Sequence, residues 1–193
     1  NRNAAVLLLG DITYPRGTLR EFTDCYHPTW GRFKQRTFPS PGNHEYLTRG
    51  ARGYFDYFGS AAGPGYYRLT LGSWQVYSLD SNLAAGPAAA QLAWLERELA
   101  ANPSPCTLAY WHHPLYSSGG HGSSARMLEA WKLLHRAGAE IVGYELREDF
   151  AARAKKNVEA FLGPDVLDRY QIEIRSAYDG IDGRDYDRVV LDL

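Results

Sequence analysis

The sequence predicts an α/β protein, in which short strands alternate with amphipathic helices. Residues 4–9 form a continuous apolar run that ends at Gly10-Asp11, a pattern typical of a buried strand followed by a loop. Leucines recur at helical spacing within residues 88–100 and predict an amphipathic helix there. Short apolar segments that we expect to be strands lie on both sides of this helix. Strands interleaved with helices along the chain indicate the α/β class.

The first half of the chain is expected to hold long loops, a hairpin and one helix. Residues 12–65 are rich in glycine, proline and aromatic residues without clear periodicity, so we predict long loops with short helices. Residues 66–71 and 75–79 flank a Gly-Ser pair, which predicts a β-hairpin. After the helix at 88–100, a short strand is expected at 107–111.

The second half of the chain has fewer helix breakers. A second amphipathic helix is predicted before Gly138, which is expected to end it. A third helix is expected before Gly163-Pro164. The predicted elements in this half are helix 126–137, strand 140–144, helix 147–162, strand 170–175 and strand 186–193.

Composition excludes several classes of protein. The chain has 193 residues, is 45% hydrophobic and carries a formal net charge of -1, so it is too apolar to be disordered and too evenly charged to be a basic nucleic-acid tail. It shows no clear nucleic-acid surface. No apolar run approaches the roughly 20 residues of a membrane span. Cys25 and Cys106 cannot build a disulfide-dense scaffold, and their pairing is left open.

The composition changes near residue 142. All five tryptophans and all six histidines precede that residue, and acidic residues outnumber basic ones after it. Such asymmetry can mark two domains. We therefore predict two segments, residues 1–142 and residues 143–193.

Polar side chains follow three of the expected strands and loops. Asp11 follows the first strand, Asn43 and His44 follow a Pro-Gly pair, and His112 follows the strand at 107–111. Ligands of α/β proteins bind beyond the carboxyl ends of strands. Carboxylate and amide oxygens together with imidazole suit Fe, Mn or Zn. His44 is suited to donate a proton to a phosphate or leaving group, and Glu45 is expected to orient it.

Each of these residues taken alone has a simpler interpretation. An isolated Asp11 more often caps a turn, and a single histidine is more often a surface or core residue. His121, in the Gly-rich loop GGHG, is equally compatible with a solvated turn. The metal-site interpretation depends on all three places occurring together in order.

The spaced motifs support a specific family resemblance. The segments GDITYPRGTLREF, PGNHEY, GYYRLTLGSWQVYSLDSN and CTLAYWHHPLYSSGGHGS occur in that order. Through about residues 1–142 the sequence resembles the calcineurin-like metallophosphoesterases, and within them the bacterial proteins similar to purple acid phosphatases. The resemblance implies a metallophosphoesterase-type β-sandwich with flanking helices, here partial. It also implies hydrolysis of small phosphorylated substrates by hydroxide activated at two metal ions, of Fe, Mn or Zn.

The resemblance also implies roles for individual residues. Asp11 corresponds to the carboxylate that bridges the two metals, and Tyr14 lies where a phenolate ligand is found. The implied metal ligands are Asp11, Tyr14, Asn43 and His112. The residues implied in catalysis near the substrate are His44, His113, which fills the middle position of His-x-Pro, and His121.

Two motifs of the family have no counterpart in this sequence. The family begins with an earlier Asp-x-His, whereas this chain begins at Asn1, so we expect that an upstream part is missing. The family also has Gly-His-x-His after a strand like residues 139–142, where this chain continues with GYEL. At least three ligands are therefore unaccounted for, and activity is expected to be impaired. The compartment stays open, although related proteins are often exported.

The tail has a resemblance of its own. The segments VGYELREDF, AKKNVE and YDRVVLDL resemble the middle of a class I S-adenosylmethionine-dependent methyltransferase of the tRNA adenine-N1 branch. This implies a Rossmann-like βαββ segment in which Glu145 binds a ribose, Asp179 lies near adenine and Asp192 ends the fourth strand. The two resemblances meet near Val142, so we expect a chimeric chain. The alternatives to a phosphoesterase are thus an S-adenosylmethionine-dependent RNA methyltransferase-related chain and a non-catalytic chimeric fragment.

Overall fold

The computed structural model describes residues 4–104, 106–115, 123–138, 141–145 and 170–174, together with five isolated helical positions, 152, 155, 156, 159 and 160. The chain divides into two compact units, Asn1–Pro114 and Leu115–Leu193, which are considered separately here. The mixture of helices and strands confirms the α/β class. The predicted division near residue 142 stays a prediction, as do the details of a β-sandwich.

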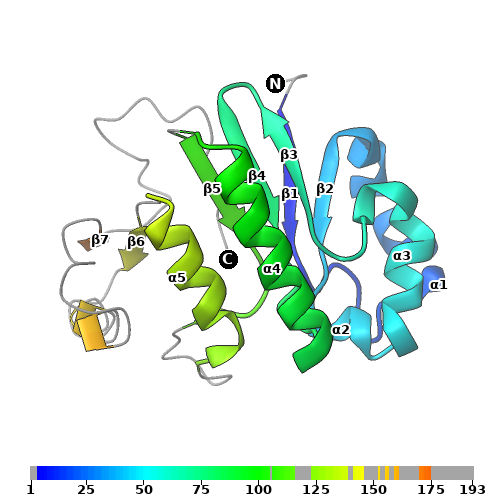
Figure 1. Ribbon diagram of the computed structural model, residues 1–193. Coiled ribbons are helices and arrows are strands. Elements are labelled where there is room, and N and C mark those ends of the chain that lie inside the picture. Colours follow the sequence, from blue (N-terminus) through cyan, green and yellow to red (C-terminus); the bar gives the residue numbers. More distant parts are fainter. Residues whose placement is uncertain are drawn as a thin grey trace. The chain divides into compact units, whose positions relative to one another are not determined.

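Two short parallel strands begin the first unit. β1 (Val6–Leu9) pairs in parallel with β2 (Thr37–Ser40), in the register Val6 to Thr37 (Figure 1). The strand predicted from the apolar run is confirmed. β2 was not predicted from the sequence, because this four-residue strand contains Pro39, which cannot donate to a ladder.

Short helical segments surround the end of β2, as predicted for residues 12–65. They bury an aromatic cluster that includes Phe22, Tyr54 and Tyr57, and this cluster anchors the loops that carry the candidate site. These segments are α1 (Leu19–Glu21), η1 (Phe22–Tyr26), η2 (Trp30–Arg36), α2 (Asn43–Tyr46), η3 (Arg49–Ala51), α3 (Arg52–Phe58) and η4 (Gly59–Ala62).

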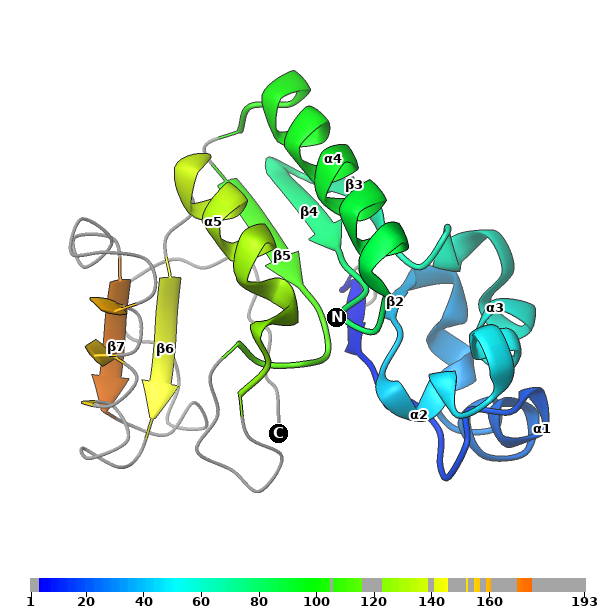
Figure 2. The same cartoon turned by 60° about the horizontal axis from the view of Figure 1, so that its bottom comes forward.

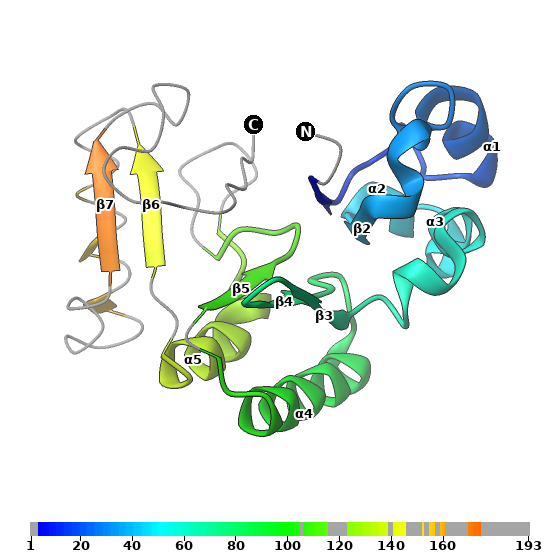
Figure 3. The same ribbon diagram turned by 90° about the horizontal axis from the view of Figure 1, so that it is seen from above.

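A three-stranded sheet completes the first unit. The predicted hairpin is confirmed as β3 (Tyr67–Leu71) and β4 (Trp74–Ser78), and β4 pairs in parallel with β5 (Cys106–Tyr110). The predicted helix is α4 (Ala85–Ala101), which connects these two parallel strands. Figure 3 shows α4 on one side of this sheet and the β1–β2 pair on the other.

Side-chain hydrogen bonds join β2 to the three-stranded sheet. Tyr110 donates its hydroxyl to the carbonyl of Phe38 at 2.9 Å, and the Ser40 hydroxyl donates to the carbonyl of Leu79 at 2.8 Å. Both bonds lie near the carboxyl ends of the strands. They therefore bring the loops that follow β1, β2 and β5 close to one another.

Among its described residues, the second unit has two helical segments before its first strand, and it has two strands. η5 (Ala125–Met127) leads into α5 (Leu128–Arg136), as predicted, and β6 (Ile141–Glu145) pairs in parallel with β7 (Tyr170–Ile174) (Figure 2). The described positions between these strands are helical, where a helix was predicted. The strand expected at 186–193 lies outside the described residues, and a Rossmann-like tail stays a prediction. In the part of the chain that the structure describes, no helix is long and apolar enough to cross a membrane.

Candidate metal centre

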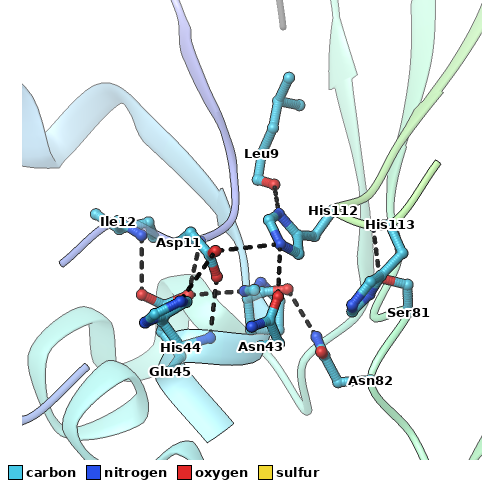
Figure 4. Close-up of polar contacts among 12 residues, drawn as sticks. Leu9, Asp11, Ile12, Asn43, His44, Glu45, Ser81, Asn82, His112 and His113 are labelled. Carbon is cyan, nitrogen blue, oxygen red and sulfur yellow. Dashed lines mark hydrogen bonds and ion pairs between the residues drawn. The ribbon is translucent and has the colours of Figure 1, made fainter. Parts of the chain in front are cut away.

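Three loops that leave the carboxyl ends of β1, β2 and β5 bring together an acid, an amide and an imidazole. Figure 4 shows Asp11, Asn43 and His112 facing one another. Nε2 of His112 lies 3.0 Å from Oδ1 of Asn43 and 3.4 Å from Oδ2 of Asp11. The sequence placed Asp11 and His112 after expected strands and Asn43 in a loop after Pro-Gly, and the structure brings the three together.

The hydrogen bond at Nδ1 of His112 determines which nitrogen of the ring carries the proton. Nδ1 lies 2.9 Å from the carbonyl oxygen of Leu9, which can only accept, so Nδ1 carries the proton. In the neutral ring Nε2 therefore presents its lone pair to the oxygens of Asn43 and Asp11. Such a bond to a backbone carbonyl is the usual way in which a metal-binding histidine is oriented.

The three atoms form a donor set that fits a cation. A carboxylate oxygen, an amide oxygen and a neutral imidazole nitrogen repel one another unless a positive charge lies among them. Among the described residues, no three His, Cys, Asp or Glu side chains form a metal-ligand group. The set found here combines two such side chains with the Asn43 amide, which gives three donor atoms that could hold one ion.

The backbone of Asp11 adopts an unusual conformation that aims its carboxylate. Its φ of 50° lies in the left-handed region, which is costly for a residue other than glycine and is found at functional sites. Oδ1 of Asp11 accepts the backbone N–H of His44 at 2.9 Å, and Oδ2 accepts the Tyr14 hydroxyl at 3.3 Å. The carboxylate is thus fixed by both neighbouring loops.

A close approach of the two loops depends on glycine. A Cβ added to Gly42 would lie 2.1 Å from Oδ1 of Asp11 and 2.2 Å from its backbone nitrogen. Real side chains do not tolerate such distances, so only glycine allows the carboxylate of Asp11 to lie against this loop.

Glu45 holds the two loops together rather than orienting His44, which corrects the role expected from the sequence. The side chain is fully buried, and its oxygens accept the backbone N–H groups of Asp11, Ile12, Thr13 and Gly42 at 2.7–3.3 Å. Burial raises the pKa of this carboxyl above its ordinary value, and the N–H donors oppose the rise.

His44 lies beside the donor set and is oriented by a backbone carbonyl. Its Nδ1 lies 2.7 Å from the carbonyl oxygen of Pro15, and its Nε2 lies 3.9 Å from Oδ2 of Asp11. Nδ1 therefore carries the proton that donates to Pro15, and Nε2 is the atom that faces the site. This places His44 where it can act on a group bound next to Asp11.

Tyr14 is near enough to Asp11 to take part in the site. The side chain is 59% exposed, and its ring packs against that of His44 with 4.4 Å between centroids. Partial burial and the carboxylate of Asp11 raise the pKa of the Tyr14 phenol. The phenol therefore stays protonated in the metal-free protein and donates to Asp11.

The remaining predicted residues lie elsewhere. His113 follows His112, but its ring contacts Ser81 on the side away from Asp11 (Figure 4), with 2.8 Å from Nδ1 to Oγ. Glu145 is the last residue of β6, in the second unit. His121, Asp179 and Asp192 lie outside the described residues.

The segment Asp80–Asn82, to which the sequence assigned no role, contacts the loops that carry Asn43 and His112. A signal was present in the sequence, because these polar residues come just after β4 and Leu79. Asp11 and His112 likewise are polar residues that follow a strand.

Comparison with known protein families finds a match over most of the chain. A family model described as calcineurin-like phosphoesterase matches residues 1–144. The match covers all the described residues that meet at the donor set.

Proposed function

Because this chain belongs to the calcineurin-like phosphoesterase family, we propose that it hydrolyses phosphate esters at a metal centre that Asp11, Asn43 and His112 hold. The observation that carries the proposal is the convergence of Nε2 of His112, Oδ1 of Asn43 and Oδ2 of Asp11, while Nδ1 of His112 is bonded to Leu9. A bound metal ion supplies Lewis acidity toward the phosphoryl group and lowers the pKa of water.

The residues at and around the donor set have separate tasks in that reaction. Asp11 supplies the negative charge that attracts the cation, and Asn43 and His112 supply neutral donor atoms. The carbonyl of Leu9 keeps the His112 ring from rotating away. His44, pinned by Pro15, presents Nε2 to the leaving group, to which it donates a proton when the ring is protonated.

The finer proposal concerns the purple acid phosphatase-like branch. In that version the chain would bind two ions of Fe, Mn or Zn, and Tyr14 would help to hold them through its phenolate oxygen. The contact of Tyr14 with Oδ2 of Asp11 supports this role, because both oxygens already adjoin the same position. The proposed substrate is a small phosphorylated molecule.

A second candidate concerns the second unit alone. β6 and β7 are parallel, with helical positions between them, and Glu145 ends β6. This order supports a methyltransferase-like segment in which Glu145 binds a ribose. Calorimetric titration with S-adenosylmethionine tests it, and the absence of binding would leave that unit without this role.

Hydrolysis of p-nitrophenyl phosphate after addition of Mn, Zn or Fe tests the main proposal. We expect metal-dependent turnover that falls by about 10² to 10⁴-fold in His44→Asn, the range that a proton donor contributes. His27→Asn is the matched control, because His27 bonds Tyr57 rather than a residue of the donor set. No metal-dependent turnover, or equal losses in both variants, would overturn the proposal.

A further inference from the structure

The segment Asp80–Asn82 begins two residues after the end of β4 and contacts the loops that carry Asn43 and His112. Asp80 and Ser81 are each only 1% exposed. Three consecutive polar side chains at such a place require specific partners, because a buried polar group without a hydrogen bond is costly. The partners show what the segment does.

Asp80 is a rigid anchor that contacts α2. Its backbone N–H donates to Oε1 of Gln91 at 2.8 Å, and its carbonyl accepts from Nε2 of Gln91 at 3.1 Å. Its carboxylate accepts the hydroxyl of Tyr46, the last residue of α2, and the backbone N–H of Asn82. Asp80 therefore fixes the far end of the short helix that begins with Asn43.

Asn82 holds the other end of the same stretch. Its Nδ2 donates to the carbonyl oxygen of Pro41 at 3.0 Å and also to Oδ1 of Asp80 at 3.1 Å. The six residues from Pro41 to Tyr46 are thus tied to one anchor at both ends. Asn43 lies between the two ties.

Ser81 connects the anchor to the loop that carries His112. Its Oγ accepts the backbone N–H of His113 at 3.0 Å and lies 2.8 Å from Nδ1 of the same residue. An oxygen that accepts the N–H can still donate its own proton to Nδ1. The backbone of the residue next to His112 is therefore held by the same segment that holds Asn43.

We propose that Asp80, Ser81 and Asn82 are positioning residues that set the metal affinity by fixing Asn43 relative to His112. The inference rests on the proposed function for its metal readout. Ligand atoms must be held to within about 0.5 Å of their productive geometry, and outer residues that orient ligands typically change metal affinity about 10 to 100-fold. The segment orients two ligands from one anchor.

The test compares variants that each remove the side-chain hydrogen bonds of one residue. Asn82→Ala removes the tie to Pro41, and Ser81→Ala removes the contacts with His113. The control, Tyr54→Phe, removes a buried bond of 3.0 Å to the carbonyl of Pro39, in β2. Mn²⁺ affinity by isothermal titration is expected to fall about 10 to 100-fold in the first two variants and less than about threefold in the control. Wild-type affinity in both Asn82→Ala and Ser81→Ala, or an equal loss in Tyr54→Phe, would overturn the proposal.

A second readout separates this inference from the proposed function. In the metal-free protein the His44 N–H donates to Oδ1 of Asp11, so its hydrogen exchange reports how closely the two loops are held. Exchange at His44 is expected to be about tenfold faster in Asn82→Ala than in Tyr54→Phe at matched stability. If the wild type binds no Mn²⁺, the proposed function fails, and this exchange rate alone decides the positioning role. Equal rates in the two variants would reject it.

Discussion

The carboxylate of Glu45 accepts the backbone N–H of Asp11 at 2.9 Å, although 34 positions separate the two residues. The same Oε2 accepts the N–H of Gly42 at 2.7 Å. One buried carboxylate therefore joins the loop after β1 to the loop after β2. It also holds Asp11 in its left-handed conformation, which the chain would otherwise leave.

Replacing Glu45 by glutamine should destabilise the protein. The amide puts an NH2 group where a carboxylate oxygen accepted N–H donors, so buried donors lose their partner. We expect the free energy of unfolding to fall by about 1–3 kcal/mol, measured by denaturant titration. Glu96→Gln, at an exposed position of α4, is the control and should change it by less than about 0.5 kcal/mol. Similar values for the two variants would contradict the joining role of Glu45.

Gly42→Ala should displace Asp11. The added Cβ would lie 2.1 Å from Oδ1 of Asp11, so the two loops must separate, at a typical cost of about 1–3 kcal/mol. Thermal unfolding and Mn²⁺ titration should both show the loss. Gly86→Ala, in α4 with no atom within 4 Å of the new Cβ, should be neutral or stabilising by up to about 1 kcal/mol. A Gly42→Ala protein that binds metal like the wild type would refute the close-approach argument.

The buried carboxyl of Asp80 should make stability depend on pH. Burial raises its pKa above the ordinary 3.8, against the opposing effect of the Tyr46 and Asn82 donors. The folded protein thus holds this proton more tightly than the unfolded chain, so the stability gained is full below 3.8 and is lost as pH rises through the folded-state pKa. The unfolding free energy of the wild type relative to Asp80→Asn should therefore fall with rising pH across that window. A rise of this free-energy difference with pH would contradict the raised pKa of Asp80.

The sequence predicted the donor set because strand-end loops can be recognised locally. The apolar run before Asp11 and the short strand expected before His112 place both residues at the carboxyl ends of strands. β1 and β5 belong to different sheets, and the hydrogen bonds that join β2 to the three-stranded sheet bring these ends together. The hairpin and α4 were likewise predictable, because turn residues and leucine spacing are local signals.

The features that the sequence did not predict depend on contacts between distant residues. β2 is short and contains Pro39, so neither length nor alternation marks it. The role of Glu45 depends on N–H groups 32 to 34 positions away, and no local pattern records them. The role of Asn82 depends on the carbonyl of Pro41 in the same way.

Metal binding by the purified chain tests the central claim most directly. We predict saturable Mn²⁺ binding, followed by electron paramagnetic resonance, that weakens at least about 100-fold in Asp11→Asn. Asparagine keeps an oxygen for the His44 N–H, so the metal-free variant should unfold near the wild-type temperature. Mn²⁺ binding that is absent from the wild type, or equally tight in Asp11→Asn, would contradict a metal centre at Asp11, Asn43 and His112.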